Sequence, residues 1–248
     1  MSLNIVSYPT SNQDERSGKD IKIDTLIFQY SGMISNQAAL ERMTDPKAKV
    51  SAHWCIDENG TAYKIVPEHL RAWHAGKSWW RGRSNLNNIS IGIEVVNPGH
   101  EFGYRPFTLQ QMNSIVILCH QILKRHPINP RNIVWHSDVA PDRKKDPGEL
   151  FDWRRLSNEG IGIWPRSIIE PRNSRILKIK DYGPEVKLCQ KKLAKFGYGL
   201  YQDGIYGEKT QMVVMAFQRH YRQARVDGVL DHGTTAILDH LVNYTKDK

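Results

Sequence analysis

Two side chains that could hold a metal ion lie ten residues apart near the middle of the sequence. Residues 133–135 form a short apolar run, as in a buried strand, and His136 follows it directly. A proline-containing loop then leads to Asp146, just ahead of Pro147 and Gly148. An imidazole at a strand end and a carboxylate on a stiff loop can be aimed at one point, and both are ordinary zinc ligands. Because two ligands do not complete a zinc site, the spacing predicts a third ligand from elsewhere in the chain.

A carboxylate that could act as a general base lies in a second apolar run, over residues 89–96. Glu94 is the acidic residue of that run. Burial disfavours the charged form of a carboxylate, so we expect the pKa of Glu94 to be raised towards neutral pH, where a general base is most useful. A strand glutamate paired with a basic residue is the alternative interpretation.

The elements that would position these groups are strands and helices in alternation. Residues 25–30 predict a buried strand, and Asn36 is expected to cap a short helix. Residues 53–56 and 62–66 indicate two strands joined around an Asn-Gly pair, which is favoured in hairpin turns. A capping box at Thr108 starts an amphipathic helix. This order predicts an α/β fold, a mixed β-sheet with flanking helices.

The sequence changes character after residue 165. A basic stretch without clear periodicity follows, as in a linker, and then Pro184 and Gly197 mark the start and end of a helix. A repeat comes next: D-G-I-Y-G-E-K-T from Asp203 is echoed by D-G-V-L-D-H-G-T from Asp227, each ahead of a helical pattern. We therefore predict a first domain, a linker and a small three-helix domain, over residues 1–165, 166–180 and 181–248.

Composition narrows the class of protein. The 248 residues carry a formal charge of +9, which favours polyanionic partners. The sequence contains no nucleic-acid-binding motif, so the net charge is the only feature that supports nucleic-acid binding. We therefore predict no nucleic-acid partner. The three cysteines lie in apolar patterns and are expected to be buried free thiols: Cys55, Cys119 and Cys189.

Targeting signals are not visible in the sequence. No apolar run approaches the roughly 20 residues of a membrane span. The N-terminus lacks a basic segment followed by a long apolar one, so no secretory signal is predicted. We expect the cell envelope or periplasm if a leader has been removed, the bacterial cytoplasm otherwise, and a monomer in either place.

Several blocks of sequence resemble the type 2 N-acetylmuramoyl-L-alanine amidases, in the order of that family. They are R-A-W-H-A-G from Arg71, S-I-G-I-E from Ser90, N-P-G-H-E from Asn97 and H-S-D-V-A-P-D-R-K-K-D-P-G from His136. The resemblance implies the zinc amidase fold, and hydrolysis of the amide between N-acetylmuramic acid and L-alanine in peptidoglycan or muropeptides. A zinc ion with an open position for water suits this reaction because it acidifies the water and polarises the carbonyl.

The resemblance also implies roles for particular residues. His136 and Asp146 would be zinc ligands, Glu94 the general base, and Lys144 the cation that meets the developing oxyanion. A further set would line the groove and bind substrate: His53, Trp73 and His74. The C-terminal repeat resembles the three-helix peptidoglycan-binding module, whose Asp-Gly turns we interpret as structural.

One position departs from the family pattern. In the family the strand that corresponds to residues 25–30 ends in a histidine, the first zinc ligand, and here that position is Gln29. A neutral amide oxygen binds zinc less well than an imidazole nitrogen, so we expect impaired zinc binding and turnover. Three accounts stay open: an engineered substitution, a natural loss of activity, or His53 or His74 as a substitute ligand. A non-catalytic protein that binds peptidoglycan or muropeptides is the alternative function.

Overall fold

The computed structural model describes residues 3–166, 168 and 175–244, which form two compact units. The first unit comprises Met1–Ser78, Asn85–His136 and Asp146–Ile163. The second unit comprises Trp79–Ser84, Ser137–Lys145 and Trp164–Lys248. Much of the predicted linker, residues 167 and 169–174, lies outside the described residues. The predicted limits of the domains stay a prediction, and each unit is treated by itself below.

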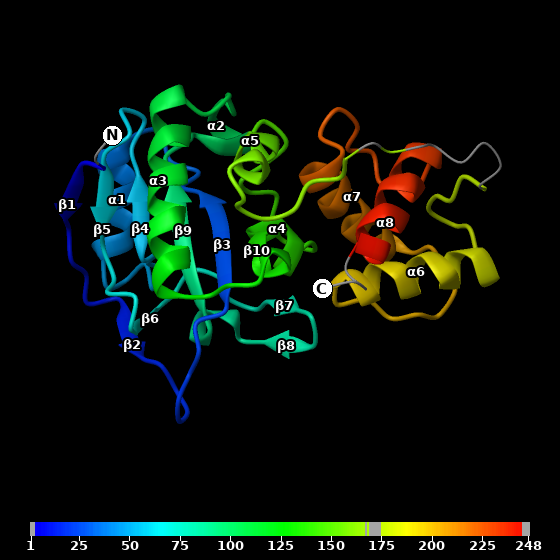
Figure 1. Cartoon of the computed structure of the whole chain (residues 1–248), viewed down its shortest axis with the longest axis horizontal. Helices are drawn as coiled ribbons and strands as arrows, with labels where there is room; N and C mark the ends of the chain where they lie inside the picture. The colour runs from blue at the N-terminus through cyan, green and yellow to red at the C-terminus, as the bar shows by residue number, and fades with distance from the viewer. Residues whose placement is uncertain (1–2, 167, 169–174, 245–248) are drawn as a thin grey trace. The chain divides into compact units, whose positions relative to one another are not determined.

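A six-stranded mixed sheet forms the centre of the first unit, which confirms the predicted fold class (Figure 1). Its strand order is β1-β5-β4-β9-β3-β10, and β4 and β5 are the antiparallel neighbours. The strands have these bounds: β1 Ile5–Ser7, β3 Thr25–Tyr30, β4 Trp54–Ile56, β5 Ala62–Lys64, β9 Ser90–Val95 and β10 Ile133–Trp135. A separate antiparallel pair joins β2 (Gln13–Glu15) to β6 (Leu70–Ala72).

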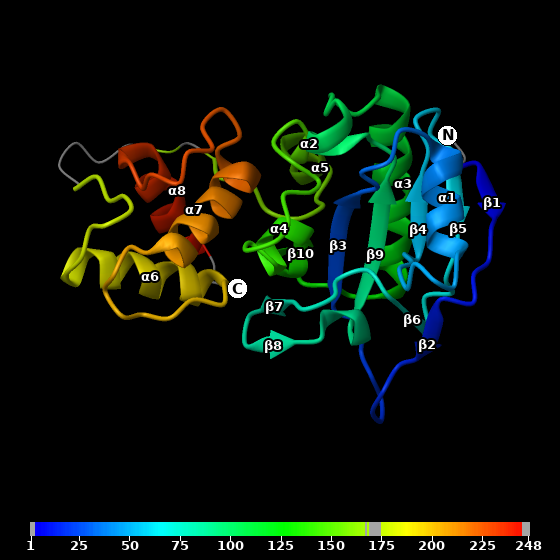
Figure 2. The same cartoon turned by 180° about the vertical axis from the view of Figure 1, so that it is seen from behind.

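Two helices cover the opposite faces of this sheet, α3 (Leu109–Arg125) on one side and α1 (Asn36–Thr44) on the other (Figures 1 and 2). The Thr108 hydroxyl accepts the Gln111 N–H and the Gln111 side chain accepts the Thr108 N–H, so the predicted capping box is confirmed. The cap of α1 was predicted wrongly. Ser35, with extended backbone, accepts the Ala38 N–H, because a cap stands before the first helical residue.

The other helices that precede the C-terminal segment are short. They are η1 Leu86–Asn88, α2 Gly99–Phe102, η2 Pro130–Asn132, α4 His136–Val139 and α5 Trp153–Asn158. All three cysteines are buried and free, as predicted.

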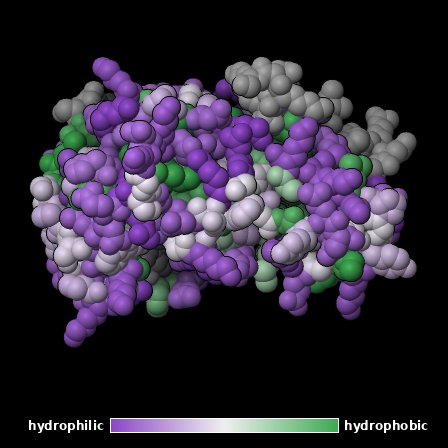
Figure 3. Space-filling view, turned by 90° about the horizontal axis from the view of Figure 1, so that it is seen from below, coloured by the Kyte–Doolittle hydropathy of each residue, from purple (hydrophilic) through white to green (hydrophobic). Residues whose placement is uncertain are grey.

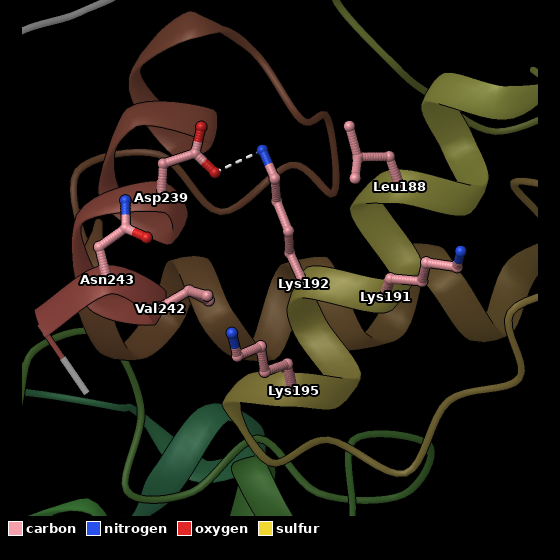
Figure 4. A pocket seen from close by; sticks show the side chains of 7 residues that line it. All are labelled: Leu188, Lys191, Lys192, Lys195, Asp239, Val242 and Asn243. Carbon is pink, nitrogen blue, oxygen red and sulfur yellow. Dashed lines mark ion pairs between the residues drawn. The ribbon is translucent and has the colours of Figure 1, made fainter. Parts of the chain in front are cut away.

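The second unit is helical, with α6 (Pro184–Phe196), α7 (Glu208–Tyr221) and α8 (His232–Tyr244). A two-stranded hairpin, β7 (Trp79–Trp80) and β8 (Arg83–Ser84), belongs to it. Pro184 and Gly197 bound α6 as predicted. Between α6 and α8 lies a basic pocket in which Lys192 pairs with Asp239 at 2.5 Å (Figure 4).

The sequence repeat is explained by one glutamine on each preceding helix. Gln190 donates to the Asp203 carboxylate and accepts the Gly204 N–H, at 2.9 and 2.8 Å. Gln218 likewise donates to the Asp227 carboxylate and accepts the Gly228 N–H, at 3.0 and 2.8 Å. The Asp-Gly turns are therefore structural, as predicted.

The surface is mostly hydrophilic on the face shown in Figure 3, with hydrophobic side chains in scattered spots. Within the described residues, no helix combines the length and hydrophobicity that crossing a bilayer requires.

Candidate active site

Three residues singled out in the sequence lie side by side on neighbouring parallel strands of the first unit. In the register of β3 and β9, Gln29 pairs with Glu94. Phe28 pairs with Trp135 of β10, so the next residue, His136, follows that strand beside Gln29. Gln29 and His136 are buried, and Glu94 is half-buried. The sheet therefore places Gln29 between the predicted general base and the predicted ligand histidine.

His136 and Asp146 form a buried pair. The sequence predicts that these two side chains point to the same place. The imidazole Nδ1 lies 2.9 Å from a carboxylate oxygen of Asp146, and the two side chains are 3% and 7% exposed. The His136 Nε2 atom is buried as well and has no hydrogen-bond partner among the residues that the structure describes. Such a pair suits a cation in two ways: both groups can bind it, or the carboxylate can orient the ring that does.

The Gln29 side chain takes part in a chain of hydrogen bonds. Its Nε2 lies 2.9 Å from Nδ1 of His74, whose Nε2 lies 3.1 Å from the Ser90 hydroxyl. That hydroxyl donates to the Leu86 carbonyl at 2.6 Å, so the ring donates to Ser90 and accepts from the Gln29 amide. Burial places the pKa of His74 well below its ordinary value, which agrees with a neutral ring.

A glycine in β9 makes room for the His74 ring. A Cβ at Gly92 would lie 2.5 Å from Cγ of His74, closer than atoms can pack. Gly92 stands two residues before Glu94, so both face the same side of the sheet. The S-I-G-I-E block thus supplies the Glu94 carboxylate and, at Gly92, a position without a side chain against which the His74 ring packs.

His53 is also held as a neutral ring. Its Nδ1 accepts the Gly92 N–H at 2.9 Å, and its Nε2 lies 3.1 Å from the Leu70 carbonyl oxygen and 3.0 Å from Nη2 of Arg16. Burial, with the nearby charge of Arg16, lowers the pKa of His53 to about 3. Both ring nitrogens therefore serve internal contacts, and the substrate-binding role of His53 and His74 stays a prediction.

Trp73 and Lys144 are the remaining predicted site residues. Trp73 is half-buried and its indole N–H donates to Asp14 at 2.6 Å. Lys144 belongs to the second unit, where its backbone N–H donates to the Ala140 carbonyl. The roles assigned to both residues stay predictions.

The donors present fit only in part the zinc centre that the resemblance implies. His136 and Asp146 are suitable ligands, but the third position holds a neutral amide whose nitrogen faces His74. Across residues 3–166, 168 and 175–244, no three His, Cys, Asp or Glu side chains are grouped so as to hold a metal ion. The site therefore combines two strong ligands with a glutamine already bonded elsewhere.

The loop between His136 and Asp146 packs in the second unit. Asp138 is buried there; one of its carboxylate oxygens accepts the Tyr198 hydroxyl at 2.6 Å and the other lies 2.7 Å from Nδ1 of His220. Burial and the Asp138 charge raise the pKa of Tyr198 well above its ordinary value. Sequence reasoning missed this cluster, because no local pattern connects residues that are 60 and 82 positions apart.

Two family profiles match the chain. The N-acetylmuramoyl-L-alanine amidase profile matches residues 19–149, more than half of the chain. This chain belongs to the N-acetylmuramoyl-L-alanine amidase family. A peptidoglycan binding domain profile matches residues 182–238, so the amidase segment is followed by a second recognised one.

Individual amidases are similar to this chain over different lengths. N-acetylmuramoyl-L-alanine amidase AmiD of Escherichia coli is 35% identical over 234 residues, which are 89% of this chain and 83% of AmiD. The 1,6-anhydro-N-acetylmuramyl-L-alanine amidase AmpD of Enterobacter cloacae is 41% identical over 107 residues, 43% of this chain and 55% of AmpD.

Solved amidase structures share the fold. AmiD from E. coli, in complex with the substrate anhydro-N-acetylmuramic acid-L-Ala-D-gamma-Glu-L-Lys, has a TM-score of 0.77 at 30% identity, with 94% of each chain covered. AmpDh3 from Pseudomonas aeruginosa has a TM-score of 0.74 at 28% identity, with 93% of this chain and 96% of AmpDh3 covered.

Proposed function

We propose that this amidase acts on the bond between N-acetylmuramic acid and L-alanine in peptidoglycan or muropeptides, and that it hydrolyses this bond slowly in a zinc-dependent reaction. The bond and the zinc dependence come from the family. One observation supports the proposed low rate: Gln29 lies between Glu94 and His136, and its amide lies within hydrogen-bond distance of His74.

Glu94 is the proposed general base. It is a half-buried carboxylate on strand β9. Strand β3, which carries Gln29, lies between β9 and the strand that His136 follows. In this role it takes a proton from the attacking water and passes it to the leaving amine of L-alanine. Lys144 is proposed to offset the charge on the carbonyl oxygen during attack.

Amide cleavage of a defined muropeptide tests the proposal. The purified full chain is incubated with a muropeptide that has an intact lactyl–alanine bond, before and after chelation and with zinc added back. We expect slow release of the stem peptide that stops on chelation and returns with zinc. Glu94→Gln should lower the rate by about 100-fold or more, since proton transfer by a positioned base contributes that much. Glu101→Gln, at an exposed glutamate of α2, is the matched control.

The second candidate function is muropeptide binding without turnover. The Gln29–His74 hydrogen bond favours this function, because it leaves His136 and Asp146 as the two available zinc ligands among the described residues. Tight binding of the same muropeptide, with no stem peptide released at any zinc concentration, would select this function over hydrolysis.

A further inference from the structure

The β7–β8 hairpin of the second unit gives its two tryptophans different environments. Trp80 is 2% exposed, and its ring packs edge-on against Phe196 and Tyr198 at centroid distances of 5.9 and 5.2 Å. Trp79 is 44% exposed, since neighbouring side chains on a strand point in opposite directions. Trp80 therefore fixes the hairpin on the unit, and Trp79 is displayed at the surface.

The displayed indole has a fixed position. A Cβ on Gly199 would lie 2.7 Å from Cδ1 of Trp79, so the indole rests against a backbone that has no side chain at this point. The hairpin turn is tied to the same segment, because the Arg81 N–H donates to the Gly197 carbonyl at 2.8 Å. Trp79 is thus a held surface aromatic.

Trp79 shares a groove of about 490 Å³ with a second exposed aromatic, Tyr201. Tyr201 is 78% exposed, and the Lys209 ammonium lies 4.9 Å from its ring centroid. Gln202 adds an amide to the same wall. Single exposed aromatics are common on protein surfaces, but two of them in one groove with a cation and an amide are typical of a binding site.

We propose that this groove binds the glycan strand of peptidoglycan, with sugar rings stacked on Trp79 and Tyr201. The choice of glycan rests on the proposed function. Sugar rings offer apolar C–H faces to aromatic rings and hydroxyls to an amide, and the carboxylates of muropeptides suit Lys209. Trp79 lies in the segment matched by the amidase profile, and Tyr201 and Lys209 lie in the segment matched by the peptidoglycan binding profile, so both contribute to the groove.

Binding to glycan strands stripped of their stem peptides tests the groove directly. The dissociation constant of the full chain is compared with those of Trp79→Ala and Tyr201→Ala. Each change removes the contact of one ring, so we expect about tenfold weaker binding. Tyr201 is so exposed that its replacement leaves folding intact. Tyr182→Ala is the matched control, because Tyr182 is 76% exposed in the same unit but does not line the groove.

A third variant tests the position of Trp79 without removing an aromatic ring. Gly199→Ala should displace the indole and weaken glycan binding, although every ring is still present. Unchanged affinity in all three variants, or an equal loss in Tyr182→Ala, would overturn the proposal. So would tighter binding of single-stranded DNA or of free stem peptide than of stripped glycan.

The outcome is independent of catalysis. Stripped strands contain no lactyl–alanine amide, so a chain without hydrolytic activity still shows the predicted pattern if the groove binds glycan. If the chain hydrolyses muropeptides but does not bind stripped strands, the proposed function holds and the groove is not a glycan-binding site.

Discussion

The proposed loss of a zinc ligand at position 29 is a change of one donor atom. A histidine offers zinc a nitrogen lone pair, whereas a glutamine offers a neutral oxygen. In this structure the amide nitrogen is also committed to His74, whose other nitrogen is committed to Ser90. The substitution therefore alters both the ligand set and the hydrogen bonds behind it.

Gln29→His should restore a ligand set of two histidines and one aspartate. We expect a zinc content near one ion per chain after dialysis, against little in the unaltered protein. We also expect an amidase rate at least about tenfold higher, because even the loss of a residue that only supports a metal ligand costs roughly 10–100-fold. Zinc analysis and muropeptide cleavage, run side by side, measure both. Equal zinc content and equal rates would show that another residue completes the site, with His53 and His74 the first to test.

The neutral state of His53 predicts an acid-sensitive fold. The folded chain holds the pKa of this ring at about 3, against an ordinary 6.5, so the unfolded chain takes up the proton first. The stabilisation is complete above about pH 6.5 and is lost as the pH falls towards 3, by about 1.4 kcal/mol per pH unit. His53→Asn keeps an acceptor for the Gly92 N–H and removes the titration. Urea unfolding between pH 7 and 5 should show a flatter pH dependence in the variant; identical slopes would contradict the prediction.

The sequence predicts the proximity of two site residues when they are close along the chain and belong to recognisable local elements. His136 and Asp146 were paired correctly because a strand end and a short loop bring them together. The Gln29–His74 bond was beyond reach, since β3 and the loop that carries His74 are 45 positions apart and only the folded sheet joins them. The same holds for Arg16, whose guanidinium donates to the Ser90 carbonyl from 74 positions away.

Elements followed their local signals closely. Capping boxes, a Pro-first helix and a repeated Asp-Gly turn are short-range features, so β3, α3 and α6 have the predicted limits to within a residue or two. The partners of each turn were not predictable, because Gln190 and Gln218 face their turns only after the helices pack.

Gln218→Ala should destabilise the second unit more than most surface changes do. The fully buried amide bonds to the turn at Asp227–Gly228 through both its oxygen and its nitrogen. Its loss leaves the buried Gly228 N–H and the partly buried Asp227 N–H without this acceptor, so we expect about 1–3 kcal/mol less free energy of unfolding. Chemical denaturation followed by circular dichroism measures the change. Gln202→Ala, at an exposed glutamine, is the control and should differ little. A similar small effect in both variants would show that the turn holds without its glutamine.

At the scale of the whole molecule, stability should depend on a cluster that spans distant parts of the sequence. Asp138 and His220 are both buried, and burial lowers the pKa of His220, so its neutral ring donates a hydrogen bond to the Asp138 carboxylate. Loss of a hydrogen bond to a charged group costs about 1.5–3 kcal/mol. We expect His220→Ala to lower the unfolding midpoint clearly. A fragment of residues 1–165 should unfold more readily still, because Trp80 and Asp138 lose Tyr198 together with their other partners. A fragment as stable as the full chain would contradict this dependence.

The path of the chain limits how its parts can be exchanged during evolution. The backbone passes from one unit to the other after residues 78, 84, 136, 145 and 163. A single recombination point near residue 163 would transfer the three C-terminal helices without the hairpin and loop that pack with them. A chain that inherits the C-terminal segment alone would therefore lack these packing partners, and we expect substitutions in Trp79–Ser84 and Ser137–Lys145 to accompany those in the helices.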